Sequence, residues 1–339
     1  MRAHPLSLVV GMDGTGPGHV LGHPCALVEG FEGFGRLIQL TVLALRDLLS
    51  NWSAPLVAPG RIALLLNLPS SVERPLLDEH LAGLFEEGLE ADEAGVLSQA
   101  VLSLVEPVLR QATVHSLQEG HTGAMIGLQW AAELLEAGRA DACIICGVDS
   151  HLDLPTLEWL NAMGQLKTVD NPMGMMPGEG AGAFVVERER SATQRGAGIL
   201  TRPGALALSE EPSGYMDQGF NPTGHALAMA LQEVIRLHPP DERELRTVIT
   251  DLNGRPRRAM DFGHALVRCS HAFHGLSGLK LWTPAASFGD VGGATAAFLI
   301  CMAVRAFARG YSGGRELLLF SCSEQGQRAA LVLDAPGHP

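Results

Sequence analysis

Apolar positions in the first third of the chain follow two spacings, one helical and one continuous. Residues such as Leu37 and Leu45 recur at helical intervals, which indicates an amphipathic helix. A continuous apolar run that stops at a Pro-Ser-Ser sequence is typical of a buried strand. The predicted elements are a helix over 34–50, a strand over 61–68, a helix over 97–111 interrupted near Pro107, and a strand over 112–117.

The middle of the chain is richer in small residues. The segment 122–137 contains Ala, Leu and Gly and stops at Gly138, which predicts a helix with a glycine at its C-terminal end. Two short apolar runs follow, and we expect strands over 142–146 and 182–186. A helix of small residues can lie between two sheets, because only small side chains allow such close approach.

The second half repeats this order of events. The predicted elements are a helix over 224–237 after Pro222, a short helix capped by Asp241, a strand over 247–252, a helix from Gly292-Gly293-Ala294 to about 308, and strands over 316–321 and 329–333. The order glycine turn, helix, strand, strand thus occurs twice. We expect an internal duplication with halves 1–190 and 191–339, packed as one compact α/β unit in α-β-α-β-α layers.

Composition narrows the class of protein. The chain has 339 residues, 46% of them hydrophobic, with 40 Gly and 20 Pro, which is typical of a globular fold with a large core. Its net charge of −13 argues against nucleic acid as a partner. The apolar run 5–10 is too short for a secretory signal, and 294–304 is too short to span a bilayer. We expect a cytoplasmic protein without membrane contact, and the scarcity of lysine indicates a GC-rich bacterial source.

Two motifs carry a resemblance to a known family. Gly-Glu-Gly-Ala-Gly at 178–182 leads into an apolar strand, and Gly-Arg-Ala-Asp at 138–141 precedes another that ends at Gly147. Both are similar to motifs of the β-ketoacyl synthases in the thiolase superfamily. The resemblance is strongest over 117–187, continues more thinly to 333, and implies a thiolase-like fold. The first 60 residues are fewer than the family usually has.

In that family, a cysteine at the N-terminus of a buried helix is acylated, and the positive end of the helix dipole favours its thiolate. The corresponding window reads Gln-Glu-Gly-His-Thr-Gly at 118–123. Alignment on Thr122-Gly123 places Gly120 at the cysteine position. A shift of one residue would place Glu119 or His121 there, and neither is a thiol.

The other catalytic positions of the family also differ. The resemblance places Asn253 at the first histidine, Asp290 at the second and Ala285 at the lysine. The C-terminal glycine loop is replaced by Ser-Glu-Gln-Gly-Gln, which begins at Ser323. The resemblance therefore implies a degenerate member without the Cys-His-His set, and no cofactor or metal is expected. We call the six residues at these positions the vestigial pocket: Glu119, Gly120, His121, Asn253, Asp290 and Ser323.

Four other cysteines differ in how well they could serve as a nucleophile. Cys143 and Cys146 lie three apart in an apolar strand and point to opposite faces, which favours a structural role. Cys301 lies in an apolar helix and is expected in the core. Cys322, at a strand end near the vestigial pocket, is the one candidate for a reactive thiol.

Histidines and acidic residues leave alternatives open. His271 and His274 are spaced for one helix face, but no further ligand completes a metal site, so surface histidines are the simpler interpretation. His115 and His121 flank the vestigial pocket, as buried histidines or as a general base. Glu119 at a helix N-terminus would gain about 0.3–1 kcal/mol from the helix dipole.

Three arginines, Arg255, Arg257 and Arg258, cluster in an otherwise acidic chain. They form either a solvated loop or a docking patch for an acidic partner.

Two functional hypotheses follow. In the first, the protein is non-catalytic and acts by binding, as an accessory subunit of a ketosynthase or as an adaptor or chaperone. Small degenerate proteins similar to this one occur beside bacterial type VI secretion effectors. In the second, it is a divergent acyltransferase that uses acyl-carrier protein or acyl-CoA. The resemblance implies a homodimer, or a heterodimer with a ketosynthase-like subunit, paired through the strand at 112–117. A further partner would be acyl-carrier protein or a secreted effector.

Overall fold

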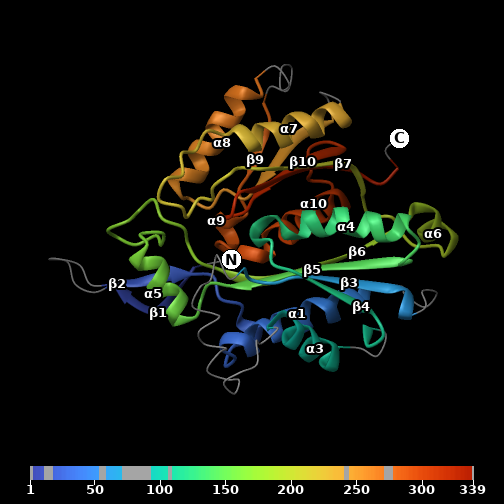
Figure 1. Ribbon diagram of the computed structural model, residues 1–339, viewed down its shortest axis with the longest axis horizontal. Helices are drawn as coiled ribbons and strands as arrows, with labels where there is room; N and C mark the ends of the chain where they lie inside the picture. The colour runs from blue at the N-terminus through green and yellow to red at the C-terminus, as the bar shows by residue number, and fades with distance from the viewer. Residues whose placement is uncertain are drawn as a thin grey trace.

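The computed structural model describes residues 3–10, 18–52, 59–70, 93–105, 109–239, 244–270 and 278–337. Two β-sheets enclose a central layer that contains helices α4 (Gly123–Glu136) and α10 (Thr295–Arg309). Further helices cover the outer face of each sheet, and the five layers lie one above the other in Figure 1. The predicted α-β-α-β-α arrangement is therefore confirmed.

The two sheets share one topology. The first has the order β4 (Thr113–Leu117), β3 (Ile62–Asn67), β5 (Ala142–Ser150), β6 (Glu179–Glu187), and the second has the order β9 (Lys280–Trp282), β8 (Leu245–Thr250), β10 (Glu316–Cys322), β11 (Gln327–Asp334), β7 (Arg202–Glu210). In both sheets the first three strands are parallel and the fourth is antiparallel. Strand β7 adds an antiparallel edge to the second sheet alone. The repeat is thus visible strand by strand, whereas a boundary at residue 190 stays a prediction.

The remaining elements complete the outer layers. They are α1 (Gly33–Asn51) and α3 (Glu93–Leu104) on the first sheet, α7 (His225–Leu237) and α8 (Pro256–Arg268) on the second, and the pair β1 (His4–Val10) and β2 (Gly18–Gly22) beside α5 (Leu154–Ala162). Short helices are α6 (Glu189–Gln194), α9 (Ala285–Phe288) and the 3-10 turns η1 (Ala26–Val28), η2 (Pro59–Arg61), η4 (Gly120–Thr122) and η5 (Gly292–Ala294).

Most predicted elements agree with the structure to within a few residues, with clear exceptions. The strand expected over 142–146 continues to Ser150, and its neighbour begins at Glu179. Elements α5, β7, α8 and β9 were not predicted. The cap at Asp241 and the break near Pro107 lie outside the described residues.

Close contact between the halves depends on small residues. A Cβ atom added to Gly147 of β5 would lie 2.8 Å from the carbonyl oxygen of Gly293. A Cβ added to Gly123 would overlap the side chain of Asn67. The Asn67 amide donates to the carbonyl oxygens of Gly120, at 2.9 Å, and Gly293, at 2.8 Å. Glycine and one buried amide therefore join the two central helix starts across the pseudo-repeat.

Of the described helical segments, Gly292–Arg309 is long and apolar enough by composition to cross a membrane. It lies in the central layer, where 56% of it is buried within the protein. Core helices of this kind meet the same criterion, so this finding is weak evidence for a membrane span.

Candidate functional site

The vestigial pocket lies where the two central helices begin. Turn η4 precedes α4 and turn η5 precedes α10, and each turn starts at a glycine with positive φ: +54° at Gly120 and +47° at Gly292. Non-glycine residues are strained in this region of φ. The position that the resemblance assigns to the cysteine is therefore a buried backbone turn that favours glycine.

The carboxylate of Asp290 connects three positions of the vestigial pocket. Its Oδ1 atom lies 2.8 Å from His121 Nε2 and accepts the backbone N–H of Gly292 at 2.9 Å. Its Oδ2 atom accepts a hydrogen bond from Asn253 Nδ2. All three side chains are buried, with exposed fractions of 3% for His121, 8% for Asn253 and 3% for Asp290. The structure therefore brings together His121, Asn253 and Asp290, which are far apart in the sequence.

The main chain of Asp290 is held as firmly as its side chain. Its N–H donates to the carbonyl oxygen of Met176 at 2.7 Å, and its carbonyl oxygen accepts the N–H of Gly178 at 2.9 Å. His151 Nδ1 lies 3.0 Å from the same carbonyl oxygen, so this nitrogen carries the hydrogen. Asp290 thereby fastens the start of α10 to the Gly-Glu-Gly motif that precedes β6.

Asp290 is ionised despite its burial. Desolvation, the largest effect, would raise the pKa of its carboxyl group, and the charge and hydrogen bond of His121 oppose it. His151 and Arg258 add to that stabilisation, and the pKa of Asp290 lies well below its usual range. Because an ionised carboxylate only accepts hydrogen bonds, His121 Nε2 is a donor here.

Behind this group lies a second cluster of buried charges. Arg258 Nη1 donates to Asp251 Oδ2 at 2.6 Å and to the carbonyl oxygen of Cys322 at 2.8 Å. Arg258 and Arg255 both donate to Glu324 Oε1. Burial opposes the positive charge of Arg258, but Asp251 and other partners raise its pKa above the usual value. Glu324 thus binds two arginines. It belongs to the segment that the resemblance places at the family's glycine loop.

Tyr215 separates this cluster from a third ion pair. The guanidinium groups of Arg258 and Arg328 lie 4.8 Å and 4.3 Å from the centre of its ring. The Tyr215 hydroxyl donates to Asp261 Oδ2 at 2.7 Å, and the same oxygen lies 3.4 Å from Arg328 Nε. Sequence reasoning did not find Asp251, Asp261 or Arg328, because no motif distinguishes them from surface charges.

The prediction of an exposed arginine docking patch is wrong for two of the three arginines. Arg255 and Arg258 are 6% and 2% exposed and bind acidic side chains within the protein. Arg257 is half-buried and donates to the backbone carbonyls of Tyr215 and Asp217. These arginines lie at the start of helix α8, and in the described part of the chain two of them are not exposed to an acidic partner.

Glu119 and Ser323 lie in turns at the vestigial pocket. The Glu119 side chain does not cap η4, and burial and the nearby Glu210 raise its pKa. The expected stabilisation of this carboxylate by the helix dipole stays a prediction. Ser323 lies in the turn between β10 and β11, where its N–H binds the carbonyl oxygen of Gln327 and its hydroxyl accepts the N–H of Gln325.

The space beside Asn253 and Asp290 is small. A cavity of about 20 Å³ lies there, lined mainly by apolar side chains such as Val291, Phe288 and Phe298. A volume of this size holds roughly one water molecule. An acyl chain does not fit in it without rearrangement of these side chains.

The remaining candidates fit structural roles. Burial raises the pKa of Cys143 to about 11 and of Cys146 to about 12, and it also raises the pKa of Cys322, which is 2% exposed. Cys322 is therefore an inert core thiol rather than a reactive one. His115 packs against Trp130, with ring centres 4.8 Å apart. His271 and His274 lie outside the described residues.

Comparison of the sequence with models of known protein families and with curated proteins finds no match. Solved structures do match. A chain from AntDE:AntF, described as a type II PKS acyl-carrier protein in complex with its ketosynthase, superposes with a TM-score of 0.71 and 14% identity, covering 92% of this chain and 87% of that one. The ishigamide ketosynthase/chain length factor gives a TM-score of 0.70 and 17% identity over 99% and 92%. The ketosynthase from module 6 of the bacillaene synthase from Bacillus subtilis 168 gives 0.69 and 13%, over 95% of this chain but 65% of that one.

Replacement of Asp290 by asparagine tests how much its negative charge contributes to stability. We expect Asp290→Asn to lower the free energy of unfolding at pH 7 by about 3–5 kcal/mol, because His121 loses an anionic partner in a buried site. The pKa of Asp290 is lower in the folded state, so its contribution to stability is complete well above about pH 4 and decreases as the pH falls below that value. Below about pH 4, urea unfolding of both proteins should show a difference that becomes smaller as the pH falls.

Asp170→Asn is the matched control, because Asp170 is exposed and its replacement should change stability by less than about 0.5 kcal/mol. A difference between wild type and Asp290→Asn that widens as the pH falls below about 4 would contradict this account of the site.

Proposed function

We propose that this chain, which has the thiolase-like fold of ketosynthases and chain length factors, acts by binding and not by acyl transfer. The observation that carries the proposal is the mutual saturation of His121, Asn253 and Asp290. These groups bind one another at the place where the resemblance expects groups that act on substrate.

Ketosynthase chemistry needs a nucleophile and free donors directed at a developing oxyanion. Gly120 supplies no side chain, and its φ of +54° opposes any other residue. Asn253 donates one of its two amide hydrogens to Asp290, and Asp290 in this state has no hydrogen to donate. A substrate carbonyl would have to displace an ionised, buried carboxylate from its donors, at a cost of several kcal/mol.

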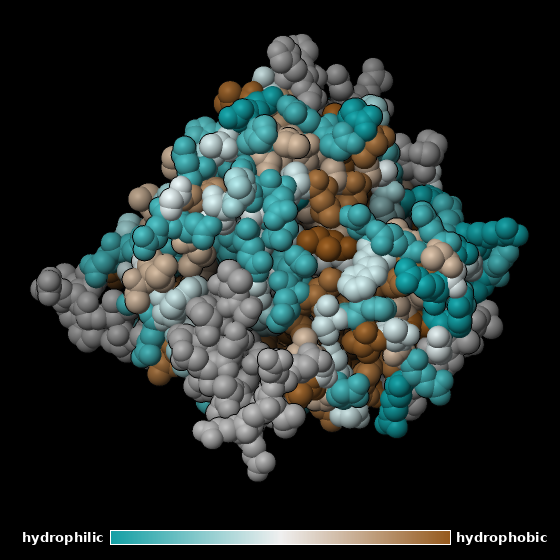
Figure 2. Space-filling view, viewed as in Figure 1, coloured by the Kyte–Doolittle hydropathy of each residue, from teal (hydrophilic) through white to brown (hydrophobic). Residues whose placement is uncertain are grey.

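The first sheet offers a surface for a partner. In the described part of the chain, β4 pairs with β3 on one side only, so its other edge has backbone groups available for pairing. Beside it, Trp130 of α4 stacks on His115 of β4. Figure 2 shows apolar residues at the middle of the same face, around the position of α4, within a mostly polar surround.

We infer that β4 pairs with a second thiolase-fold subunit, either another copy of this chain or a ketosynthase-like protein. One matched structure supports this kind of assembly, because it is described as a ketosynthase/chain length factor. An adaptor or chaperone for a secreted effector, including a type VI secretion effector, is a second form of the same binding function. An acyl-carrier protein is the alternative partner.

One observation favours a divergent acyltransferase as the second candidate. His121 and Asp290 form a buried pair with 2.8 Å between Nε2 and Oδ1, the arrangement in which a carboxylate orients a general base. In such an enzyme the acyl group would come from acyl-carrier protein or acyl-CoA.

Acyl loading distinguishes the two candidates. We expect no covalent adduct when the full chain is incubated with acyl-CoA or acyl-carrier protein and its intact mass is measured, because the nucleophile position is Gly120. A catalytically active ketosynthase serves as the positive control. We expect Gly120→Cys to remain unacylated as well, since positive φ strains the cysteine and Asn253 and Asp290 bind each other. A stoichiometric, hydroxylamine-sensitive adduct on the wild-type chain would establish the second candidate.

The predicted pairing through the edge of β4 is tested by measuring the molar mass of the protein by light scattering over a range of concentrations. We expect a dimer at micromolar concentration, or a monomer that dimerises when a ketosynthase-like partner is added. Thr113→Lys on the exposed side of β4 should weaken association about tenfold or more, because edge lysines oppose strand pairing. Leu281→Lys on the edge strand β9 is the matched control and should leave association unchanged. Equal association of both variants would place the interface elsewhere.

A further inference from the structure

At the end of β10 opposite to Ser323, two buried carboxylates face each other. Glu316 and Asp334 are cross-strand partners of β10 and β11, and their side chains are 3% and 8% exposed. Like charges directly opposite on neighbouring strands destabilise a sheet, and buried anions need a cation or protons. This end of the second sheet therefore requires a positive group between the two carboxylates.

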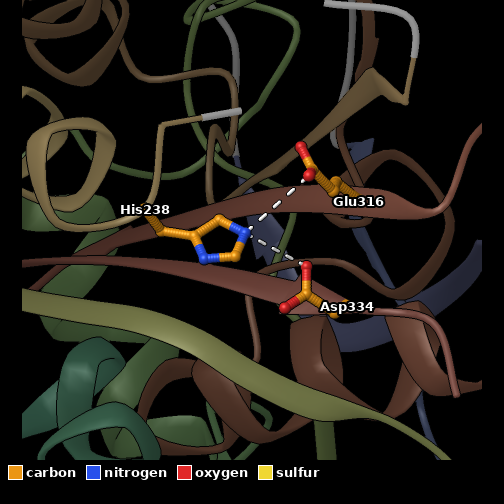
Figure 3. Close-up of side chains that lie close together, drawn as sticks. All are labelled: His238, Glu316 and Asp334. Carbon is orange, nitrogen blue, oxygen red and sulfur yellow. Dashed lines mark ion pairs between the residues drawn. The ribbon is translucent and has the colours of Figure 1, made fainter. Parts of the chain in front are cut away.

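His238 lies between these carboxylates. It is the residue that ends α7, and its Nε2 atom is 3.3 Å from Asp334 Oδ1 and 3.7 Å from Glu316 Oε1. Figure 3 shows the ring nitrogen directed toward the gap between the two acidic side chains. Among the described residues, these three form a group whose donor atoms all lie within 4.8 Å of one another.

A second observation points to a ligand in this gap. The Oδ1 atom of Asp334 is buried, is directed into the group, and accepts no hydrogen bond, although His238 Nε2 is near it. A buried carboxylate oxygen without a hydrogen bond costs on the order of 1–3 kcal/mol or more. The ring nitrogen of His238 and Asp334 Oδ1 thus lie 3.3 Å apart without a hydrogen bond of good geometry between them.

The neighbouring strand leaves room for this arrangement. A Cβ atom at Gly204 of β7 would lie 2.9 Å from the His238 ring and 3.0 Å from Asp334 Oδ2. Arg202, opposite Asp334 in the sheet, directs its guanidinium to Glu189 at 3.0 Å and 2.6 Å. The strand beside the group is therefore shaped around it.

We propose that His238, Glu316 and Asp334 bind one divalent transition-metal ion, with Zn²⁺ as the best fit. One imidazole nitrogen and two carboxylate oxygens are ligands that zinc takes at about 2.0–2.2 Å. In a tetrahedron of such bonds, ligand atoms are about 3.4 Å apart, close to the 3.3 Å and 3.7 Å between His238 Nε2 and the two carboxylates. A water molecule takes the fourth position. The ion fastens the end of α7 to β10 and β11, so its role is structural and independent of the vestigial pocket.

Metal titration of the full chain, after removal of metal with EDTA and dialysis, tests the proposal. We expect one strong Zn²⁺ site per chain by competition with a chromophoric chelator. His238→Gln and Asp334→Asn should each weaken binding by at least about tenfold. His225→Gln, an exposed histidine at the other end of α7, is the matched control and should bind as the wild type does.

Co²⁺ provides a readout on the wild-type chain that does not depend on how the variants fold. We expect the visible absorption of a four-coordinate nitrogen and oxygen site without a thiolate charge-transfer band. Zn²⁺ should also raise the urea midpoint of the wild type and not that of His238→Gln. Absence of strong binding by the wild type, a thiolate band, or equal affinity of His238→Gln would overturn the proposal.

Discussion

The ionised carboxylate of Asp290 is the interaction on which the centre of this protein depends. It accepts hydrogen bonds from His121 in the first half and from Asn253 and Gly292 in the second, and its main chain is bonded to Met176 and Gly178. A buried anion is costly unless it is fully paired, and the neighbouring groups supply that pairing. The carboxylate of Asp290 thus joins the two pseudo-repeats.

This constraint supports the proposal that the protein acts by binding. Groups that act on a substrate must be available to it, whereas His121 and Asn253 direct their donors to Asp290. Behind them, Arg258 and Glu324 form a second buried charge cluster, and the cavity beside Asn253 and Asp290 holds about one water molecule. The framework around the helix starts has been kept, while its polar groups stabilise the fold. The sheet edge at β4 remains the surface suited to a partner.

Much of the layered fold could be predicted from the sequence, because small residues and apolar runs mark the central helices and the buried strands. Helix α8 could not be predicted from the pattern of apolar residues. Its buried residues include Arg258, Asp261 and Ala265, so the inward face of the helix is largely charged. Periodicity of apolar residues does not detect such a face, and its arginines were interpreted as a loop or docking patch. The pairing of Asp290 with His121 was equally hidden, since the two lie 169 positions apart.

The positions of the vestigial pocket were predicted from the resemblance, but not what their side chains do. Glu119 was expected to benefit from the helix dipole, yet desolvation and Glu210 raise its pKa. Electrostatics of this kind depend on groups brought together only by folding, and no local pattern contains them.

A double-mutant cycle between His121 and Asp290 tests the central claim most directly. The free energy of unfolding would be measured for the wild type, for His121→Ala, for Asp290→Ala and for the double variant. Since the two groups form a buried pair with 2.8 Å between them, we expect a coupling energy of about 2–3 kcal/mol. A coupling within about 0.5 kcal/mol of zero, as found for independent sites, would contradict the account of Asp290 as the joint between the two halves.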